Sequence, residues 1–303
     1  MKDYLIFSGS SNLQLSEAVA KIMGQPLGKV DLNRFADGES RPWIQENVRG
    51  KTVFIVQSLS KSSDENFMEL AFMADAIKSG TPRSMIAIIP YLGYARQDRQ
   101  ARPGEPISAR VIATFLEACY FDEVITVDIH NTAVIGFSRI PTQNITAKDI
   151  FVNRIKEIID ENTIVVSPDI GSAKRSRKIA DATNLPMITV EKNRPVDQWD
   201  NTEMEEVHAD ISGKNVIIYD DMISTGGTII NCTKILKNAG ARAVTVCATH
   251  GVFAGNAIQN IFDSGVTKLI VADTIKLPEY RDTRIEQISV ADLLTKTIKE
   301  ILG

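Results

Sequence analysis

The sequence has few cysteines and no long hydrophobic run. Its 303 residues include three cysteines, Cys119, Cys232 and Cys247, which lie far apart and have no metal-ligand spacing. We therefore expect small core thiols in a reducing cytoplasm, without disulfides. No run approaches the ~18 apolar residues of a membrane span, and the start has too short an apolar stretch for a signal peptide. These absences predict a cytoplasmic protein without a membrane partner.

A strong excess of either charge is also missing. The chain has 34 lysines and arginines against 38 acidic residues, which gives a net charge of -4. A general nucleic-acid-binding protein would have a basic footprint over the whole chain, so we expect no nucleic acid partner. Any site for an anion must therefore be local.

Short β-branched runs alternate with helical patterns along the whole chain. Three of these runs are "TVFIVQS", "EVITVDIH" and "NVIIYDD", and each is followed by a segment with helical spacing or a polar loop. Continuous Val and Ile runs separated by helices are typical of parallel sheets covered on both faces. The predicted fold class is α/β.

The two halves of the chain resemble each other. Lys214 in "GKNVIIYDD" follows Lys51 in "GKTVFIVQS" by 163 residues, and the helix-ending Gly240 follows Gly80 by 160. The near-constant offset favours two domains of one fold, although two βαβ units can also be similar by chance.

The boundary between these domains is expected in the polar segment "PTQNITAKD". The predicted domains are residues 1–145 and 146–303. No flexible linker or low-complexity tract separates them.

The stretch "VIIYDDMISTGGTII" has the composition of a sugar-phosphate site. Its strand, Val216 to Tyr219, delivers Asp220 and Asp221 to the carboxyl edge of a parallel sheet, where open α/β folds bind ligands. Glycines and hydroxyls then lead into a helix expected near Thr228: Ser224, Thr225, Gly226, Gly227 and Thr228. Unpaired amides at a helix start can bind a phosphate, and the carboxylates can bind ribose hydroxyls or a hydrated Mg²⁺. The alternative is a solvated turn before a capped helix.

This loop resembles the phosphoribosyl-diphosphate loop of type I phosphoribosyltransferases and of ribose-phosphate diphosphokinases. Five further motifs are similar to the diphosphokinases, in the same order: "RFADGE" at 34–39, "YARQDRQARPGEPISA" at 94–109, "VDIH" at 127–130, "SPDIG" at 167–171 and "EKNR" at 191–194. The resemblance runs from about Ser8 to Val290. It implies two tandem type I phosphoribosyltransferase-like domains, an ATP side in the first and a ribose 5-phosphate side in the second.

The arginine-rich motif is a candidate triphosphate site. Arg96, Arg99 and Arg102 lie just beyond an apolar strand and form a local cationic loop. From the residues alone, a solvated charged loop is the alternative. The resemblance implies that Arg96 and Gln97 contact ATP.

The motif "RFADGE" can be a turn that follows a core aromatic residue. The resemblance implies instead that Phe35, Asp37, Gly38 and Glu39 bind the adenine nucleotide and reach the site of a neighbouring subunit. It therefore implies a homo-oligomer, a hexamer or a smaller assembly built from dimers.

Two residues at strand ends are candidate metal ligands. His130 ends "EVITVDIH", where it can bind a metal or cap the core, and Asp169 follows "VVSP" in the second half. The resemblance implies that His130 and Asp169 are Mg²⁺ ligands, one from each domain.

The stretch "EKNRPVDQWDNTEMEE" has no helical or strand periodicity and is long for a loop without function. It is interpreted as a mobile lid, with an inert surface loop as the alternative. The resemblance implies that Lys192 and Arg194 are catalytic and that Arg194 also contacts ribose 5-phosphate. Where the family has a basic residue between them, this chain has Asn193.

Together, the motifs predict a Mg²⁺-dependent transfer of the diphosphoryl group of ATP to the C1 hydroxyl of ribose 5-phosphate. Asp220 and Asp221 are expected to hold the ribose hydroxyls, directly or through a second Mg²⁺, and the loop that follows is expected to hold the 5-phosphate. Ser224 stands where most family members have a third acid. The alternatives are a phosphoribosyltransferase and an inactive regulatory paralogue.

Overall fold

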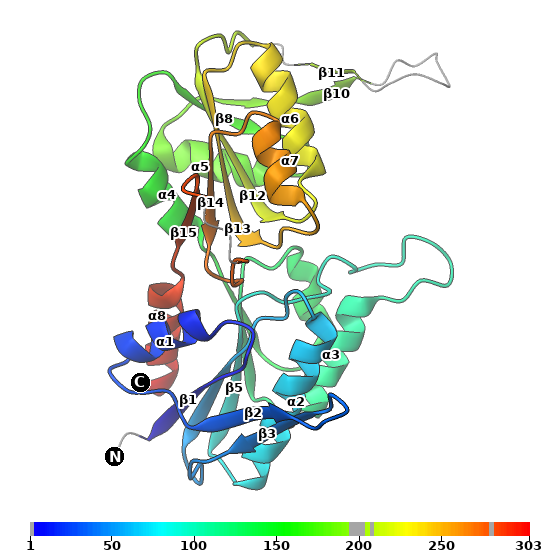
Figure 1. Ribbon diagram of the computed structural model, residues 1–303, viewed down its shortest axis with the longest axis vertical. Coiled ribbons are helices and arrows are strands. Elements are labelled where there is room, and N and C mark those ends of the chain that lie inside the picture. The colour runs from blue at the N-terminus through cyan, green and yellow to red at the C-terminus, as the bar shows by residue number, and fades with distance from the viewer. Residues whose placement is uncertain (1–2, 194–203, 207–208, 279–281) are drawn as a thin grey trace. The chain divides into compact units, whose positions relative to one another are not determined.

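The computed structural model describes residues 3–193, 204–206, 209–278 and 282–303. The chain divides into two compact units. Unit 1 comprises Met1–Ala147, Asp273–Pro278 and Ser289–Gly303, and unit 2 comprises Lys148–Ala272 and Glu279–Ile288. Each unit has a parallel sheet flanked by helices, which confirms the predicted α/β class (Figure 1). None of the helices in the described residues is both long enough and apolar enough to span a membrane.

Unit 1 contains a five-stranded sheet in which every neighbouring pair is parallel. Its strands lie in the order β1 (Tyr4–Ser8), β4 (Thr52–Val56), β5 (Ser84–Ile89), β6 (Glu123–Val127) and β7 (Thr142–Ile145). Every residue of β4 is buried. Its continuous apolar run is therefore explained by cover on both faces of the sheet.

The helices of unit 1 cover both faces of this sheet. They are α1 (Leu13–Ile22), α2 (Ser63–Ser79), α3 (Ser108–Ala118), the 3₁₀ helix η1 (Thr132–Phe137) and α8 (Ala291–Leu302). α1 and α8 contact each other on one face, whereas α2 and α3 cover the other (Figure 1). An antiparallel pair, β2 (Val30–Arg34) and β3 (Ser40–Ile44), packs against α2.

Unit 2 contains a six-stranded sheet that is also parallel throughout. The order is β15 (Ile285–Ile288), β14 (Lys268–Ala272), β13 (Ala243–Gly251), β12 (Asn215–Ile223), β8 (Thr163–Ser167) and β9 (Met187–Thr189). Four helices flank it: α4 (Lys148–Lys156), α5 (Ala173–Thr183), α6 (Gly227–Asn238) and α7 (Ala257–Asp263). A short antiparallel pair, β10 (Glu191–Asn193) and β11 (Met204–Glu206), was not expected from the sequence, which has no alternating pattern there.

The two sheets share one topology, which supports a repeated domain over chance similarity. The order β1, β4, β5, β6, β7 in unit 1 corresponds to β8, β12, β13, β14, β15 in unit 2. Lys51 and Lys214, which were matched in the sequence, directly precede the equivalent strands β4 and β12. The predicted domain 146–303 includes the final helix, α8, whereas the structure assigns α8 to unit 1. The sequence did not indicate this assignment.

The loops after the two equivalent strands differ. In unit 1, Gln57 follows β4 and is buried. Its amide nitrogen donates to Glu69 at 2.8 Å, and its amide oxygen accepts from the Ser11 N–H at 3.1 Å. The buried Glu69 carboxylate also accepts from the Ser10 N–H at 2.7 Å. A satisfied polar network therefore closes this edge in unit 1.

The packing of α8 onto unit 1 gives a stability prediction. Leu294 is fully buried on α8, whereas its neighbour Leu293 is partly exposed. We expect Leu294→Ala to lower the free energy of unfolding by about 2–5 kcal/mol, because it leaves a cavity in a packed core. Leu293→Ala should cost clearly less. In the Leu294→Ala variant, amide hydrogen exchange in α1 and β1 should be faster than in the parent protein. Faster exchange confined to β8 and β12 would contradict the assignment of α8 to unit 1.

Candidate active site

The acid pair lies on the central strand of unit 2. β12 continues to Ile223, four residues beyond the predicted end, so Asp220 and Asp221 are within the strand. Their side chains are 17% and 6% exposed. Adjacent carboxylates with so little access to water need a cation or several hydrogen-bond donors nearby.

Arg175 in the first turn of α5 supplies that cation. Its Nη1 atom lies 2.6 Å from Asp220 Oδ1 and 3.2 Å from Asp221 Oδ1. The sequence analysis missed this residue. Its only signal was membership of the basic stretch "KRSRK", and that stretch does not show which cation faces the acids.

The electrostatics of the pair indicate a site for ligands. Burial, and then the neighbouring Asp221 carboxylate, raise the pKa of Asp220 to about 7, whereas Arg175 acts in the opposite direction. Groups with such raised pKa values are concentrated at functional sites, because a ligand can complete the stabilisation that the protein leaves incomplete. The free site therefore favours ligands that bring hydrogen-bond donors or a cation.

The loop after β12 contains one buried glycine with exposed residues on either side of it. Gly226 has φ +81°, and a Cβ atom there would lie 2.8 Å from the Ile261 side chain. Helix α6 begins at Gly227, one residue before the predicted start. Its N-cap residue is Gly226, so no side chain at that position caps the helix by a hydrogen bond. Thr225, Gly227 and Thr228 are exposed. The first amides of α6 are therefore accessible to an anion.

Asp169 follows β8 and is held in a fixed orientation. Its Oδ1 atom accepts from the Ser172 N–H at 2.8 Å and from the Ser172 hydroxyl at 2.9 Å. The Ser167 hydroxyl donates to the Asp169 carbonyl at 2.7 Å. The sequence did not identify Ser172, because a serine near a helix start is common and has no specific signal.

A polar pocket of about 520 Å³ lies within unit 1. Its lining includes Arg96, Gln97, Asp98, Arg99, His130 and Asn131. The structure thus brings together Arg96, Gln97 and His130, which the sequence proposed separately. His130 is exposed. Its role, as a metal ligand or as a cap on the core, stays a prediction.

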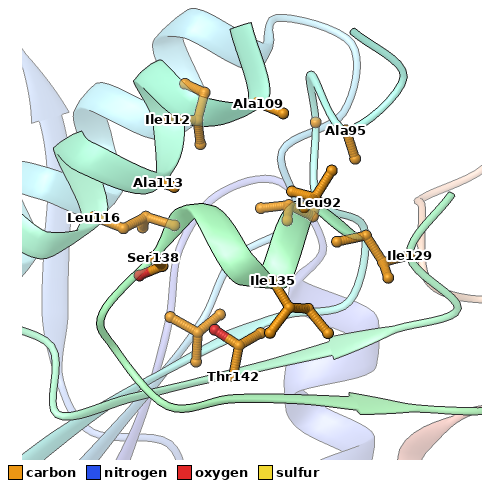
Figure 2. A pocket seen from close by; sticks show the side chains of 13 residues that line it. Leu92, Ala95, Ala109, Ile112, Ala113, Leu116, Ile129, Ile135, Ser138 and Thr142 are labelled. Atoms are coloured by element: carbon orange, nitrogen blue, oxygen red, sulfur yellow. The ribbon is translucent and has the colours of Figure 1, made fainter. Parts of the chain in front are cut away.

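A small apolar cluster of Ala95, Ala109, Ile129 and Val134 contains the residues that directly precede Arg96 and His130 in the chain. Figure 2 shows the neighbouring cavity, into which Leu92 and Ile135 also project. Its volume of about 20 Å³ has room for about one water molecule, so it is a packing gap and not a second ligand site.

The backbone is strained at two residues that precede the pocket lining, each two positions before Arg96 or His130. Tyr94 and Asp128 have φ angles of +63° and +38°, which residues other than glycine rarely adopt. The Asp128 carboxylate accepts from the Ala147 N–H at 3.1 Å. Strain of this kind is concentrated at functional sites, where the surrounding structure maintains it.

The motif "RFADGE" forms the loop between β2 and β3. Phe35 is 49% exposed, so it is not the core aromatic of the simpler interpretation, and the Arg41 guanidinium lies 5.1 Å from its ring centroid. Gly38 has φ +96°, and its N–H donates to the Phe35 carbonyl at 2.9 Å. Asp37 Oδ1 accepts from the Glu39 N–H at 3.2 Å. These residues are not part of the polar pocket lining, and their role in ATP binding stays a prediction.

The expected lid is described only in part. Lys192 lies on β10, opposite Glu205 of β11, so its backbone belongs to an antiparallel pair. Arg194 lies outside the described residues. The catalytic roles of both residues stay predictions.

Fold and site together define a protein with two α/β units of one topology in tandem, of which the second has an open acid-pair loop. Residues 4–119 match the N-terminal domain of ribose phosphate pyrophosphokinase, and residues 157–303 match the phosphoribosyl synthetase-associated domain. The chain belongs to the ribose-phosphate pyrophosphokinase family, the diphosphokinases of the sequence resemblance.

Similar proteins cover nearly the whole chain. The ribose-phosphate pyrophosphokinase 1 of Streptococcus pyogenes is 41% identical over 99% of this chain and 94% of its own length. A Campylobacter jejuni ribose-phosphate pyrophosphokinase is 38% identical over 99% and 96%. The crystal structure of phosphoribosylpyrophosphate synthetase from Mycobacterium smegmatis has a TM-score of 0.91 and 34% identity, with 99% of each chain covered.

The two loop glycines provide a matched pair of variants. Gly226→Ala should destabilise the protein by about 1–3 kcal/mol, because alanine is strained at positive φ and its Cβ would clash with Ile261. Gly227→Ala should leave the free energy of unfolding nearly unchanged, since Gly227 begins a helix and a Cβ atom there would meet only Thr225 Oγ1, at 4.0 Å. Chemical denaturation of both variants checks this, and equal losses would contradict the loop geometry.

The raised pKa of Asp220 predicts a pH-dependent stability. Between its ordinary pKa and about 7, the folded state keeps a proton that the unfolded state releases, so this residue lowers stability as the pH rises through that range. Asp220→Asn should therefore raise the melting temperature more at pH 8 than at pH 4. An equal change at both values, measured by calorimetry without substrates, would contradict the assignment.

Proposed function

We propose that the chain transfers the diphosphoryl group of ATP to the C1 hydroxyl of ribose 5-phosphate, which gives 5-phosphoribosyl 1-diphosphate and AMP. The observation that carries this proposal is the buried acid pair followed by an open glycine loop at the end of β12. Family membership over the full chain supports the reaction, and the polar pocket of unit 1 supplies cations for a triphosphate.

Ribose 5-phosphate is assigned to unit 2. Asp220 and Asp221 accept hydrogen bonds from the two vicinal ring hydroxyls, and charge-assisted bonds of this kind are stronger than neutral ones. The 5-phosphate binds to the amides at the start of α6 and to the hydroxyls of Ser224, Thr225 and Thr228. Ser224 keeps a hydroxyl for this purpose although it lacks the charge of an acid.

ATP is assigned to unit 1. Arg96 and Gln97 contact the phosphates in the polar pocket, because a guanidinium pairs well with phosphate oxygens. The exposed ring of Phe35, together with Asp37, Gly38 and Glu39, receives the adenine nucleotide of a neighbouring subunit. This sharing requires a homo-oligomer, a hexamer or a smaller assembly built from dimers.

Mg²⁺ is assigned to His130 and Asp169. The Asp169 carboxylate has the oxygen donors that Mg²⁺ prefers and is oriented by Ser172. Among the described residues, no group of three or more metal-ligating side chains occurs. Mg²⁺ usually takes one or two protein ligands and completes its shell with water and substrate phosphates. The bound ion would neutralise phosphate charge.

The reaction requires positioning and charge stabilisation, without a covalent intermediate. The C1 hydroxyl oxygen forms a bond to the β-phosphorus as the bond from that phosphorus to the oxygen bridging to the α-phosphate breaks, so AMP is the leaving group. Lys192 and Arg194 stabilise the negative charge that develops on the transferred group.

One assay tests the proposal. The purified protein with ATP, Mg²⁺ and ribose 5-phosphate should form AMP and phosphoribosyl diphosphate in equal amounts. A phosphoribosyltransferase would form no AMP from these substrates, and an inactive paralogue would bind them without turnover. Either result refutes the proposal, and Asp220→Asn with Asp221→Asn provides the inactive control.

The metal assignment gives a separate prediction. His130→Ala and Asp169→Ala should each raise the Mg²⁺ concentration needed for half-maximal activity, because each removes one protein ligand. Isothermal titration with Mg²⁺ in the presence of ATP should show weaker binding in both variants. An unchanged metal dependence in both would show that the ligands lie elsewhere.

A further inference from the structure

We propose that Arg175 is a positioning residue that holds Asp220 and Asp221 in the orientation that recognises the vicinal hydroxyls of the sugar. The inference rests on the proposed function, since it deepens the assignment of ribose 5-phosphate to unit 2. Arg175 reaches both carboxylates through one nitrogen, at 2.6 and 3.2 Å. A single guanidinium thus links two adjacent residues of β12.

The contacts around Asp220 fix its carboxylate plane. Asp220 Oδ1 accepts from Arg175 Nη1 at 2.6 Å and from the Asp221 N–H at 2.9 Å. Two donors at one oxygen define the direction of the whole carboxylate group. A ligand with two neighbouring hydroxyls gains most from acceptors that are oriented before it binds.

Charge gives Arg175 a second effect. Two carboxylates side by side repel each other and also repel the phosphate that binds a few residues further along the loop. When both carboxylates are ionised, one arginine reduces the local charge of the acid pair to about one negative unit, which leaves the carboxylates as acceptors but weakens their repulsion of the phosphate.

The first turn of α5 places Arg175 reliably. Ser172, which precedes the helix, bonds to Asp169 through its N–H and its hydroxyl, and Arg175 follows three residues later. The same turn therefore orients the proposed metal ligand and the acid pair. Arg177, two residues further along α5, is exposed and provides a matched control.

The test compares ribose 5-phosphate with 2-deoxyribose 5-phosphate, which lacks one of the two vicinal hydroxyls. In the parent enzyme, ribose 5-phosphate should bind at least about 10-fold more tightly, the effect of one charge-assisted hydrogen bond. Arg175→Met should reduce this ratio toward 1 and should raise the KM for ribose 5-phosphate more than it lowers kcat. Arg175→Lys should restore part of the ratio, because an ammonium keeps the charge but not the planar geometry. Arg177→Met should behave as the parent.

Other outcomes would overturn the proposal. If Arg175→Met and Arg175→Lys both keep the parent ratio, the arginine does not position the acid pair. A higher KM for ATP with unchanged sugar discrimination would show that Arg175 binds the nucleotide instead. Both results presuppose an active parent that forms AMP, so they are distinct from failure of the proposed function, in which the parent itself is inactive. Circular dichroism identifies a variant that fails to fold, and the remaining Arg175 variant then decides.

Discussion

The second unit depends on the burial of two adjacent carboxylates beside one guanidinium. β12 delivers Asp220 and Asp221 to a place with little water, where they destabilise each other, and α5 supplies Arg175 as the compensating cation. Because the compensation is incomplete, the pKa of Asp220 stays raised. A protein keeps such a destabilising pair of buried charges at a site where a bound ligand completes their stabilisation. The rest of the site, from the glycine loop to the start of α6, is built around the end of this strand.

The two units share one strand order but differ in the loops at the ends of equivalent strands. At the end of β4, Gln57 donates to Glu69, and the two side chains accept from the backbone amides of Ser11 and Ser10. At the equivalent end of β12, acids replace the amide and the loop opens onto the start of α6. In unit 1 the polar pocket lies one and two strands further on, after β5 and β6, where Arg96 and His130 contribute to its lining. The same sheet edge thus has different side chains in its loops in the two units.

What the sequence predicted correctly is local. The strands follow from continuous apolar runs, and the glycine loop follows from adjacent acids and glycines within a few residues. What it missed depends on contacts between distant residues. Arg175 lies 45 positions from Asp220, and α8 packs on α1 at the opposite end of the chain. The pairing of β10 with β11 also has no periodic signal, because strands of three residues are too short to show alternation.

The distribution of charge explains how a chain with a net charge of -4 can select anionic substrates. Screening limits the reach of exposed charges to about 8 Å in physiological salt, so the charge of the whole chain has little effect at the site. What matters is the arrangement within that distance: arginines around the pocket of unit 1, and one arginine between two acids in unit 2. In the proposed ribose 5-phosphate site, an acid pair without its arginine would repel the sugar phosphate. The role that we propose for the cation on α5 is therefore to let the two carboxylates recognise hydroxyl groups beside a phosphate.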